Sequence, residues 1–321
     1  TMRTLFHLLR ILTVALLVPL MAAGCAKKRT ETKWRIAFSQ CTTTEPWRVL
    51  FNARLRAEAA KHPDVKLIIA DAQDKTANQV AQVENFIRQR VDAILISPKE
   101  SAGLTDVVAQ AYDAGIPVIV LDRGVNTDKY TCFIGADNME IGRAAGEYAV
   151  ELLGGKGKAK GYIVEIWGGM GSTPAQERHA GFQHVIDNEP SIKTVVGRQD
   201  GDWKQDKAYN IMETALKAQP RIDLVYAHND PMAFGAYLAA QDAGRAKEIK
   251  FIGIDGIPEE GCKWVAEGIL AGTFLYPTPG EEGLRVALKV LRGEKVPKRI
   301  TLPTARITKA NVQQFLPAKS E

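Results

Sequence analysis

Short apolar runs rich in β-branched residues alternate with amphipathic stretches along most of the chain. Nearly continuous apolar runs are typical of strands that are buried on both faces of a sheet. They predict strands at residues 34–38, 65–70, 92–97, 116–121, 131–135, 162–167, 194–197, 222–227, 251–254 and 273–276. Apolar positions at helical spacing predict helices at residues 47–61, 79–89, 139–153, 174–187, 206–218 and 231–243.

This alternation indicates the doubly wound α/β class, in which helices cover both faces of a parallel sheet. The chain has 321 residues, which is enough for two domains of ordinary size. A weak internal repeat supports two lobes: the tripeptide Asp-Ala-Gly at 113–115 precedes a strand that closes on Asp122, and the same tripeptide at 242–244 precedes one that closes on Asp255. Because the carboxyl ends of parallel strands face the ligand crevice, both lobes are expected to face one cleft.

Three helix starts carry capping signals. Thr173 and Thr278 each precede a proline, an arrangement that favours a threonine cap with proline at the first helical position. Asp230 also precedes a proline and could accept from the free amides of the first turn, although a ligand contact is an equally good interpretation.

Composition narrows the function. The chain has 42 basic and 37 acidic residues, a net charge of +5. Two of the basic residues, Arg3 and Arg10, lie in an N-terminal segment without acidic residues. The rest of the chain therefore has 40 basic and 37 acidic residues. That balance disfavours a nucleic-acid partner, which requires a concentrated basic stripe. The sequence contains no serine-hydrolase elbow, zinc-protease motif or phosphate-binding loop, so we expect neither an enzyme nor a cofactor or metal. Beyond residue 25 the cysteines are Cys41, Cys132 and Cys262, an odd number that predicts buried thiols or, alternatively, one bridge.

The N-terminus predicts export. Arg3 and Arg10 precede an apolar run at 11–21 that is short for a membrane span, and Ala-Ala-Gly-Cys follows at 22–25. This segment resembles a bacterial lipoprotein signal, with a signal peptide at 1–24, Cys25 as the lipidated residue and a polar tether at 25–33. Lipoprotein signals usually have leucine where Ala22 stands, so ordinary secretion is the alternative. Either way we expect a periplasmic or cell-surface protein.

Polar and aromatic residues gather at predicted strand ends and helix starts. A sugar presents apolar ring faces and many hydroxyls, so its site requires an aromatic wall with acidic, amide and guanidinium groups. The candidate ligand-binding residues are Ser39, Glu45, Trp47, Arg48, Asp122, Arg123, Asp137, Arg178, Trp203, Asn229, Asp255 and Tyr276. Two of these residues have an alternative interpretation. Trp203 could be a core residue at a helix start, and Arg178 could form an ion pair on the surface.

Six segments carry a family resemblance. They read IAFSQ at 36–40, VIVLDR at 118–123, ADN at 136–138, ERHAGF at 177–182, YAHND at 226–230 and GIDG at 253–256. In this order they resemble the type I periplasmic sugar-binding proteins of ABC transporters, the ribose-binding-protein family. Trp47-Arg48 and the segment at 226–230 are similar to motifs of its galactofuranose-binding branch, which the chain resembles most. The resemblance implies two Rossmann-like lobes joined by three crossovers, with residues 34–136 and 277–303 in the N-terminal lobe and residues 137–276 and 304–321 in the C-terminal lobe.

The resemblance also implies roles for the candidate residues. The positions that match Asp122, Arg123, Arg178, Asn229 and Asp255 hydrogen-bond sugar hydroxyls, and those that match Trp47 and Trp203 form aromatic walls. The ribose binder has two aromatic residues where Trp47 and Arg48 stand, so ribose in its pyranose form is a poor fit.

The predicted function is capture of a monosaccharide, galactofuranose or a related sugar, for an ABC importer. The alternative is a sensor that reports a sugar or polyol to a membrane receptor or kinase. The expected partners are the sugar and a transporter permease, with membrane attachment through the lipid anchor only, and we expect a monomer. The sequence leaves open whether a polyol or a sugar acid replaces the sugar.

Overall fold

The computed structural model describes residues 32–317. The predicted signal peptide, Cys25 and all of the predicted tether before residue 32 lie outside the described residues. No helix within the described range has both the length and the apolar character that a membrane span requires.

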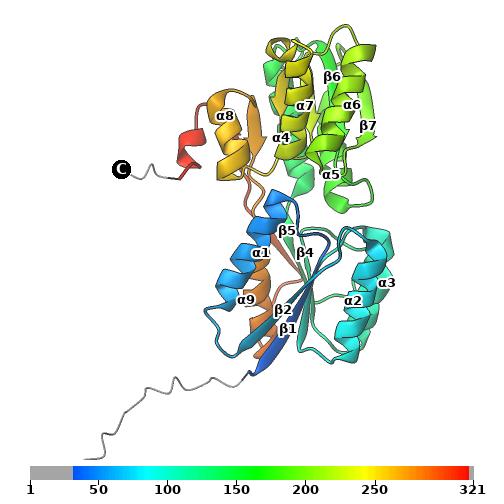
Figure 1. The fold of residues 1–321 in the computed structure, drawn as a ribbon, viewed down its shortest axis with the longest axis vertical. Helices are drawn as coiled ribbons and strands as arrows, with labels where there is room; N and C mark the ends of the chain where they lie inside the picture. The colour runs from blue at the N-terminus through cyan, green and yellow to red at the C-terminus, as the bar shows by residue number, and fades with distance from the viewer. Residues whose placement is uncertain (1–31, 318–321) are drawn as a thin grey trace, which may run out of the picture. The chain divides into compact units, whose positions relative to one another are not determined.

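The first of two sheets has six parallel strands in the order β11-β5-β4-β3-β1-β2. Its strands are β1 (Trp34–Gln40), β2 (Val65–Asp71), β3 (Ala93–Ser97), β4 (Val118–Leu121), β5 (Cys132–Ala136) and β11 (Arg299–Leu302). The helices packed on it are α1 (Pro46–Ala59), α2 (Thr76–Arg88), α3 (Ser101–Asp113) and α9 (Gly280–Leu291). We call this unit the first lobe (Figure 1).

The second sheet has the order β12-β10-β9-β8-β6-β7. Its strands are β6 (Gly161–Trp167), β7 (Ile192–Asp200), β8 (Leu224–Ala227), β9 (Lys250–Ile252), β10 (Gly272–Phe274) and β12 (Arg306–Thr308). Its helices are α4 (Asn138–Leu152), α5 (Thr173–Ile186), α6 (Gln205–Ala218), α7 (Asp230–Asp242) and the short α8 (Lys263–Glu267). All of its strand pairs are parallel except β10–β12, which is antiparallel. We call this unit the second lobe.

Alternation of side chains along each strand builds a core on both faces of each sheet. In β1, Ile36 and Phe38 pack with α1 and α9, whereas Ala37 packs on the opposite face with α2 and α3. The second sheet is covered in the same way, by α4 and α5 on one face and by α6 and α7 on the other. This arrangement confirms the predicted doubly wound α/β class.

The chain passes between the sheets three times, after β5, after β10 and after β11. These passages correspond to the three crossovers that the family resemblance implies. The segments that follow the carboxyl ends of β1 and β4 in one sheet and of β6, β7, β8 and β9 in the other carry most of the predicted ligand-binding residues.

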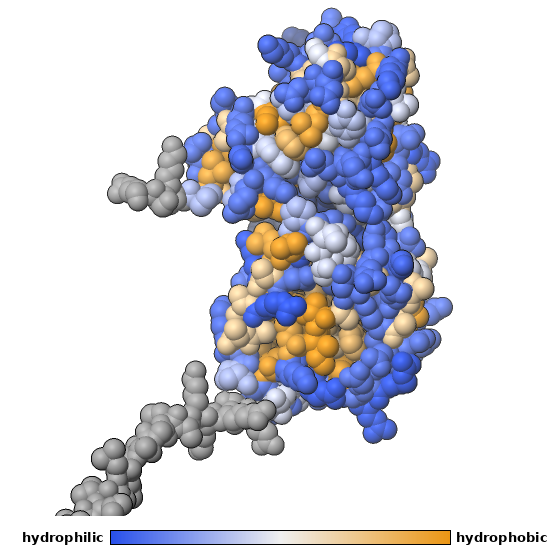
Figure 2. All heavy atoms as spheres, in the orientation of Figure 1, coloured by the Kyte–Doolittle hydropathy of each residue, from blue (hydrophilic) through white to orange (hydrophobic). Residues whose placement is uncertain are grey.

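The surface in view in Figure 2 is mostly polar. Apolar atoms gather in the first lobe, over the place where Figure 1 draws β1 and β2. Strand β2 forms one edge of its sheet and its residues are only partly buried, which accounts for this patch.

The structure corrects the predicted helix caps. Thr173 is the first residue of α5, and its hydroxyl accepts from the backbone amide of Gly124 instead. Thr278 precedes α9 without capping it, and Pro279 takes the cap position. Asn229, not Asp230, caps α7, because its side chain accepts from the amide of Met232.

Strands β11 and β12, which are short and partly exposed, are not among the predicted strands. The cysteine prediction is confirmed for the described residues: Cys41, Cys132 and Cys262 are buried and unbridged.

Candidate functional site

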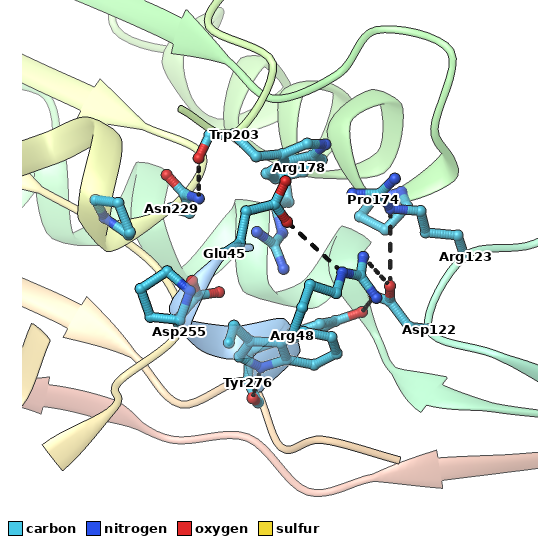
Figure 3. A pocket seen from close by; sticks show the side chains of 13 residues that line it. Glu45, Arg48, Asp122, Arg123, Pro174, Arg178, Trp203, Asn229, Asp255 and Tyr276 are labelled. Carbon is cyan, nitrogen blue, oxygen red and sulfur yellow. Dashed lines mark hydrogen bonds and ion pairs between the residues drawn. The ribbon is translucent and has the colours of Figure 1, made fainter. Parts of the chain in front are cut away.

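A hollow of about 390 Å³, part of it open to solvent, lies where residues of both lobes meet. Its lining includes the predicted residues Glu45, Trp47, Arg48, Asp122, Arg123, Arg178, Trp203, Asn229, Asp255 and Tyr276. Figure 3 shows most of these side chains converging on the hollow, with Glu45 projecting into its middle.

The carboxylate of Asp122 accepts three hydrogen bonds from other side chains. Asp122 follows β4 with a φ of 65°, a strained conformation of the kind that clusters at binding sites. Its Oδ2 atom accepts from Arg48 Nη2 at 2.7 Å and from the Ser97 hydroxyl at 3.1 Å, and its Oδ1 atom accepts from the Tyr276 hydroxyl at 2.7 Å. Burial raises the pKa of Asp122, but Arg48 and Arg123 together with these bonds bring that pKa below its ordinary value. The carboxylate is therefore ionised in a buried place.

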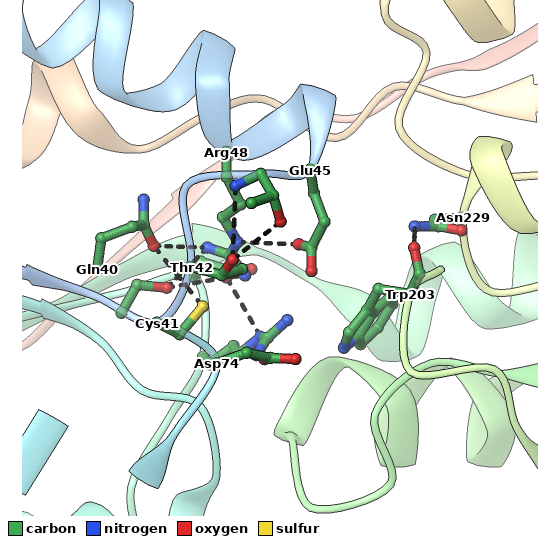
Figure 4. Close-up of polar contacts among 12 residues, drawn as sticks. Gln40, Cys41, Thr42, Glu45, Arg48, Asp74, Trp203 and Asn229 are labelled. Carbon is green, nitrogen blue, oxygen red and sulfur yellow. Dashed lines mark hydrogen bonds and ion pairs between the residues drawn. The ribbon is translucent and has the colours of Figure 1, made fainter. Parts of the chain in front are cut away.

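Arg48 extends from the first turn of α1 and is almost completely buried. Besides Asp122, it donates to Ser97 Oγ at 2.8 Å and to Gln40 Oε1 at 3.4 Å, and it lies 3.7 Å from the carboxylate of Glu45 (Figure 4). Burial raises the pKa of Glu45, and the charge of Arg48 opposes that rise. The guanidinium of Arg48 is thus already engaged by two acidic side chains.

Trp47 and Tyr276 form one aromatic wall. Their ring centroids lie 5.3 Å apart, and the indole nitrogen of Trp47 donates to the backbone oxygen of Tyr276 at 2.8 Å. This bond joins α1 to the segment that follows β10 across 229 residues of sequence. It fixes both rings at the point where the chain crosses between the lobes.

Trp203 forms the facing wall, and glycine at 168 makes room for it. Trp203 has a φ of 66°, and a Cβ atom at Gly168 would lie 2.3 Å from its indole ring. The glycine-rich turn after β6 therefore serves ring packing. The guanidinium carbons of Arg123 and Arg178 lie 5.2 Å and 5.4 Å from the Trp203 ring, within cation–π range.

Arg178 is fixed by two bonds from α5. Its Nε donates to Asn138 Oδ1 at 2.9 Å, and its Nη1 donates to the backbone oxygen of His228. Asn138 in turn donates to the Tyr276 hydroxyl at 3.4 Å. Arg178 is therefore linked through Asn138 to Tyr276, and through Tyr276 to Asp122. Arg178 is 2% exposed, which rules out the surface ion pair considered for it.

Asn229 and Asp255 complete the lining from the second lobe. Asn229 caps α7 and also donates to the backbone oxygen of Trp203 at 3.1 Å. Asp255 follows β9 with a φ of 139°, and burial raises its pKa well above the ordinary value, against the opposing charge of Arg178. Asp122 and Asp255, the two strand-end acids of the internal repeat, thus line the same hollow.

Two predicted residues lie outside the lining. Ser39 in β1 bonds Gln82 at 2.8 Å, and Asp137 caps α4 by accepting from the amide of Glu140 at 3.0 Å. For both, the predicted ligand contact stays a prediction without support from the pocket geometry.

Sequence reasoning did not identify Ser97 and Asn138, which hold Asp122 and Arg178, or the three lining prolines Pro46, Pro174 and Pro231. Each of these prolines stands in the first turn of a helix, and that position was the available signal. The lining combines aromatic rings with guanidinium, carboxyl and amide groups, so the hollow is suited to a polar molecule with apolar faces.

Known proteins resemble this chain over most of its length. The sequence model of the periplasmic binding protein domain matches residues 36–295. The galactofuranose-binding protein of Escherichia coli strain K12 is 33% identical over 295 residues, covering 89% of this chain and 91% of its own. The ribose import binding protein of Bacillus subtilis strain 168 is 31% identical over 295 residues, covering 91% and 93%.

Among solved structures, the fructose-binding periplasmic domain of a hybrid two-component system has a TM-score of 0.84 and 41% identity, and the match covers 88% of this chain and 93% of that domain. The family model matches most of the chain, and the relatives resemble the chain in both sequence and fold. The chain belongs to the family of periplasmic binding proteins that includes the ribose and galactofuranose binders.

Proposed function

We propose that this protein is an exported solute-binding protein that encloses one neutral monosaccharide between its lobes and delivers it to an ABC importer. The observation that carries the proposal is the lining of the hollow. Charged groups that bracket hydroxyls, Asp122, Arg123 and Arg178, lie beside the aromatic residues Trp47 and Trp203. Such a mixture suits the alternating C–H faces and hydroxyls of a sugar ring.

Charge balance favours a neutral sugar over a sugar acid. A guanidinium such as that of Arg48 could pair with the carboxylate of a sugar acid, but it already lies 2.7 Å from Asp122 and 3.7 Å from Glu45. A ligand carboxylate would have to compete with both acids for that charge. A sugar hydroxyl, in contrast, can donate to a carboxylate and accept from a guanidinium without displacing either.

The furanose ring form has support from the relatives. One relative is named for galactofuranose. We propose a furanose-type hexose such as galactofuranose or fructose as the first ligand to test. The carbon-13 spectrum of an isotopically labelled sugar distinguishes the ring forms directly, because the anomeric carbon of a furanose resonates at a different position from that of a pyranose.

The sensor function is the second candidate, and one finding favours it. The structural neighbour with 41% identity is the periplasmic domain of a hybrid two-component system. Both functions use enclosure of a ligand between the lobes, so ligand affinity does not separate them. Stimulation of the ATPase activity of a reconstituted transporter by the loaded protein would support the importer role, and activation of a membrane kinase would support the sensor role.

Export and lipid anchoring through Cys25 stay part of the proposal, and the N-terminal sequence pattern is what supports them. Metabolic labelling with a fatty acid, compared between the wild type and Cys25→Ser, tests the anchor. Incorporation that Cys25→Ser abolishes would establish lipidation. Equal incorporation, or none in either protein, would leave ordinary secretion as the better account.

A thermal-shift screen tests the binding function. The purified protein, dialysed free of carbohydrate, is heated with fructose, galactose, arabinose, ribose, myo-inositol and galacturonate. A ligand at 100 times its dissociation constant adds about 2.7 kcal/mol to the free energy of unfolding. We expect a clear shift with at least one neutral sugar and none with the sugar acid. A shift with galacturonate alone would contradict the proposed ligand class.

A further inference from the structure

Four charged residues outside the pocket lining form a closed ring of ion pairs between the lobes. Lys99 Nζ lies 2.6 Å from Asp74 Oδ1 and 2.8 Å from Asp202 Oδ1, and Lys204 Nζ lies 2.7 Å from both Asp74 Oδ2 and Asp202 Oδ2. Asp74 and Lys99 follow β2 and β3 of the first lobe, whereas Asp202 and Lys204 follow β7 of the second. Two of the four pairs, Lys99–Asp202 and Lys204–Asp74, therefore bridge the lobes.

The ring differs from an ordinary surface ion pair. Isolated exposed pairs contribute little, because water competes with them and two long side chains lose freedom. Here each charge has two opposite neighbours, and the side chains of Lys99 and Asp202 are only 12% and 15% exposed. Burial raises the pKa of Asp202, but its bonds to Lys204, Lys99 and Lys207 bring that pKa well below the ordinary value.

Two members of the ring, Lys99 and Asp202, are joined directly to residues of the pocket lining. The backbone oxygen of Lys99 accepts from Arg123 Nη1 at 3.2 Å. Asp202 precedes Trp203, and both residues have positive φ angles, 49° and 66°. The guanidinium carbon of Arg123, in the segment after β4, lies 5.2 Å from the Trp203 ring, so a further contact between the lobes adjoins the ring of ion pairs.

We propose that Asp74, Lys99, Asp202 and Lys204 form an electrostatic latch that favours the closed arrangement of the lobes and positions Trp203 against the sugar. The effect on sugar affinity rests on the proposed function, but the effect on closure does not. The latch increases the affinity for a ligand, because the ion pairs stabilise the closed arrangement and less of the ligand's binding free energy is used to close the lobes.

The neighbouring Lys207 provides a matched control. Its Nζ lies 3.0 Å from the same carboxylate of Asp202, but both residues belong to the second lobe. Lys99→Met and Lys204→Met each remove a bridging charge, whereas Lys207→Met removes a charge of the same sign that does not bridge. All three variants replace a lysine by an apolar side chain of similar length.

Two measurements test the latch. Small-angle X-ray scattering of the sugar-free protein reports closure, and calorimetric titration with a sugar reports affinity, each at about 10 mM and about 1 M salt, where the screening length falls from about 30 Å to about 3 Å. We expect Lys99→Met and Lys204→Met to enlarge the radius of gyration at low salt and to weaken sugar binding at least about fivefold. High salt should have the same effect on the wild type and little on these variants.

The proposed latch is contradicted if both bridging variants scatter like the wild type, provided that circular dichroism shows them to be folded. It is also contradicted if Lys207→Met has as large an effect as the bridging variants. If no sugar binds any of the proteins, the proposed function fails. The scattering of the sugar-free protein still decides the latch in that case, so the two failures are distinguishable.

Discussion

The Nη2 atom of Arg48 lies 2.7 Å from Oδ2 of Asp122, and this buried pair is part of the lining of the hollow. Charges taken out of water are stable only when they are paired and their remaining hydrogen-bonding capacity is used. Ser97 and Tyr276 supply the additional bonds to the carboxylate. The first lobe therefore presents a rigid, ionised acceptor before any ligand arrives, which lowers the cost of ordering on binding.

Asp122→Asn should abolish most sugar binding. The change keeps the size of the side chain but leaves the buried guanidinium of Arg48 without its nearest counter-charge, and breaking a buried pair typically costs about 3–5 kcal/mol. We expect at least about a thirtyfold loss of affinity, or about 2 kcal/mol, in calorimetric titration. Asp113→Asn, which disrupts the exposed pair with Lys129, is the control and should bind normally. Equal affinities in the two variants would contradict this role of Asp122.

Tyr276→Phe should weaken binding without removing the aromatic wall. The ring that packs against Trp47 remains, but the 2.7 Å bond from the hydroxyl to Asp122 is lost. A hydrogen bond to a charged group contributes about 1.5–3 kcal/mol, so affinity should fall between about tenfold and about a hundredfold. Tyr209→Phe removes a comparable bond to Asp242 on the surface and should have no effect on binding. Unchanged affinity in Tyr276→Phe would show that the bond is dispensable.

Gly168→Ala should displace Trp203. The added methyl group would lie 2.3 Å from the indole ring, closer than any real contact, so the ring or the turn must move. We expect weaker sugar binding and a changed tryptophan fluorescence spectrum. Gly197→Ala in β7, where the new methyl meets only a side-chain methyl of Thr194 at 3.1 Å, is the milder control. A Gly168→Ala variant with wild-type affinity would mean that the Trp203 wall is not required.

Asp230 should make stability fall as pH rises between about 4 and about 6. Burial raises the pKa of Asp230 to about 6, although bonds from the Thr273 hydroxyl and the Gly256 amide oppose the rise. In that interval the folded protein retains a proton that the unfolded chain, with the ordinary pKa of 3.8, has released. The free energy of unfolding therefore decreases with pH across the interval and levels off above it.

Urea unfolding of the wild type and Asp230→Asn at several pH values checks this. The difference between the two proteins should change between about pH 4 and pH 6 and stay constant above about pH 7. A difference that does not depend on pH would mean that the carboxyl group of Asp230 titrates normally.

Strand-end residues were the part of the site most accessible to sequence reasoning. Asp122 and Asp255 each terminate an apolar strand, and the rule that ligands bind beyond the carboxyl ends of parallel strands places them at one cleft. The structure has both in the lining of the same hollow. The fold class followed from the same alternation of strands and helices, because that pattern has few packed solutions.

The supporting contacts could not be predicted in this way. Asn138 and Ser97 hold Arg178 and Asp122 through contacts that are distant in sequence, and neither residue differs locally from an ordinary serine or asparagine. The cap at α7 was assigned to Asp230 rather than Asn229 because adjacent polar residues compete for the same role. Only the tertiary environment, the Thr273 hydroxyl and the Gly256 amide, decides that Asp230 turns inward.

Calorimetric titration of the carbohydrate-free wild-type protein with the neutral sugar that gives the largest thermal shift is the most direct test of the account. We predict one sugar bound per chain, and binding at least about thirtyfold weaker to Asp122→Asn under the same conditions. Absence of binding by every neutral sugar, or binding that Asp122→Asn leaves intact, would contradict the claim that the hollow between the lobes is a monosaccharide site.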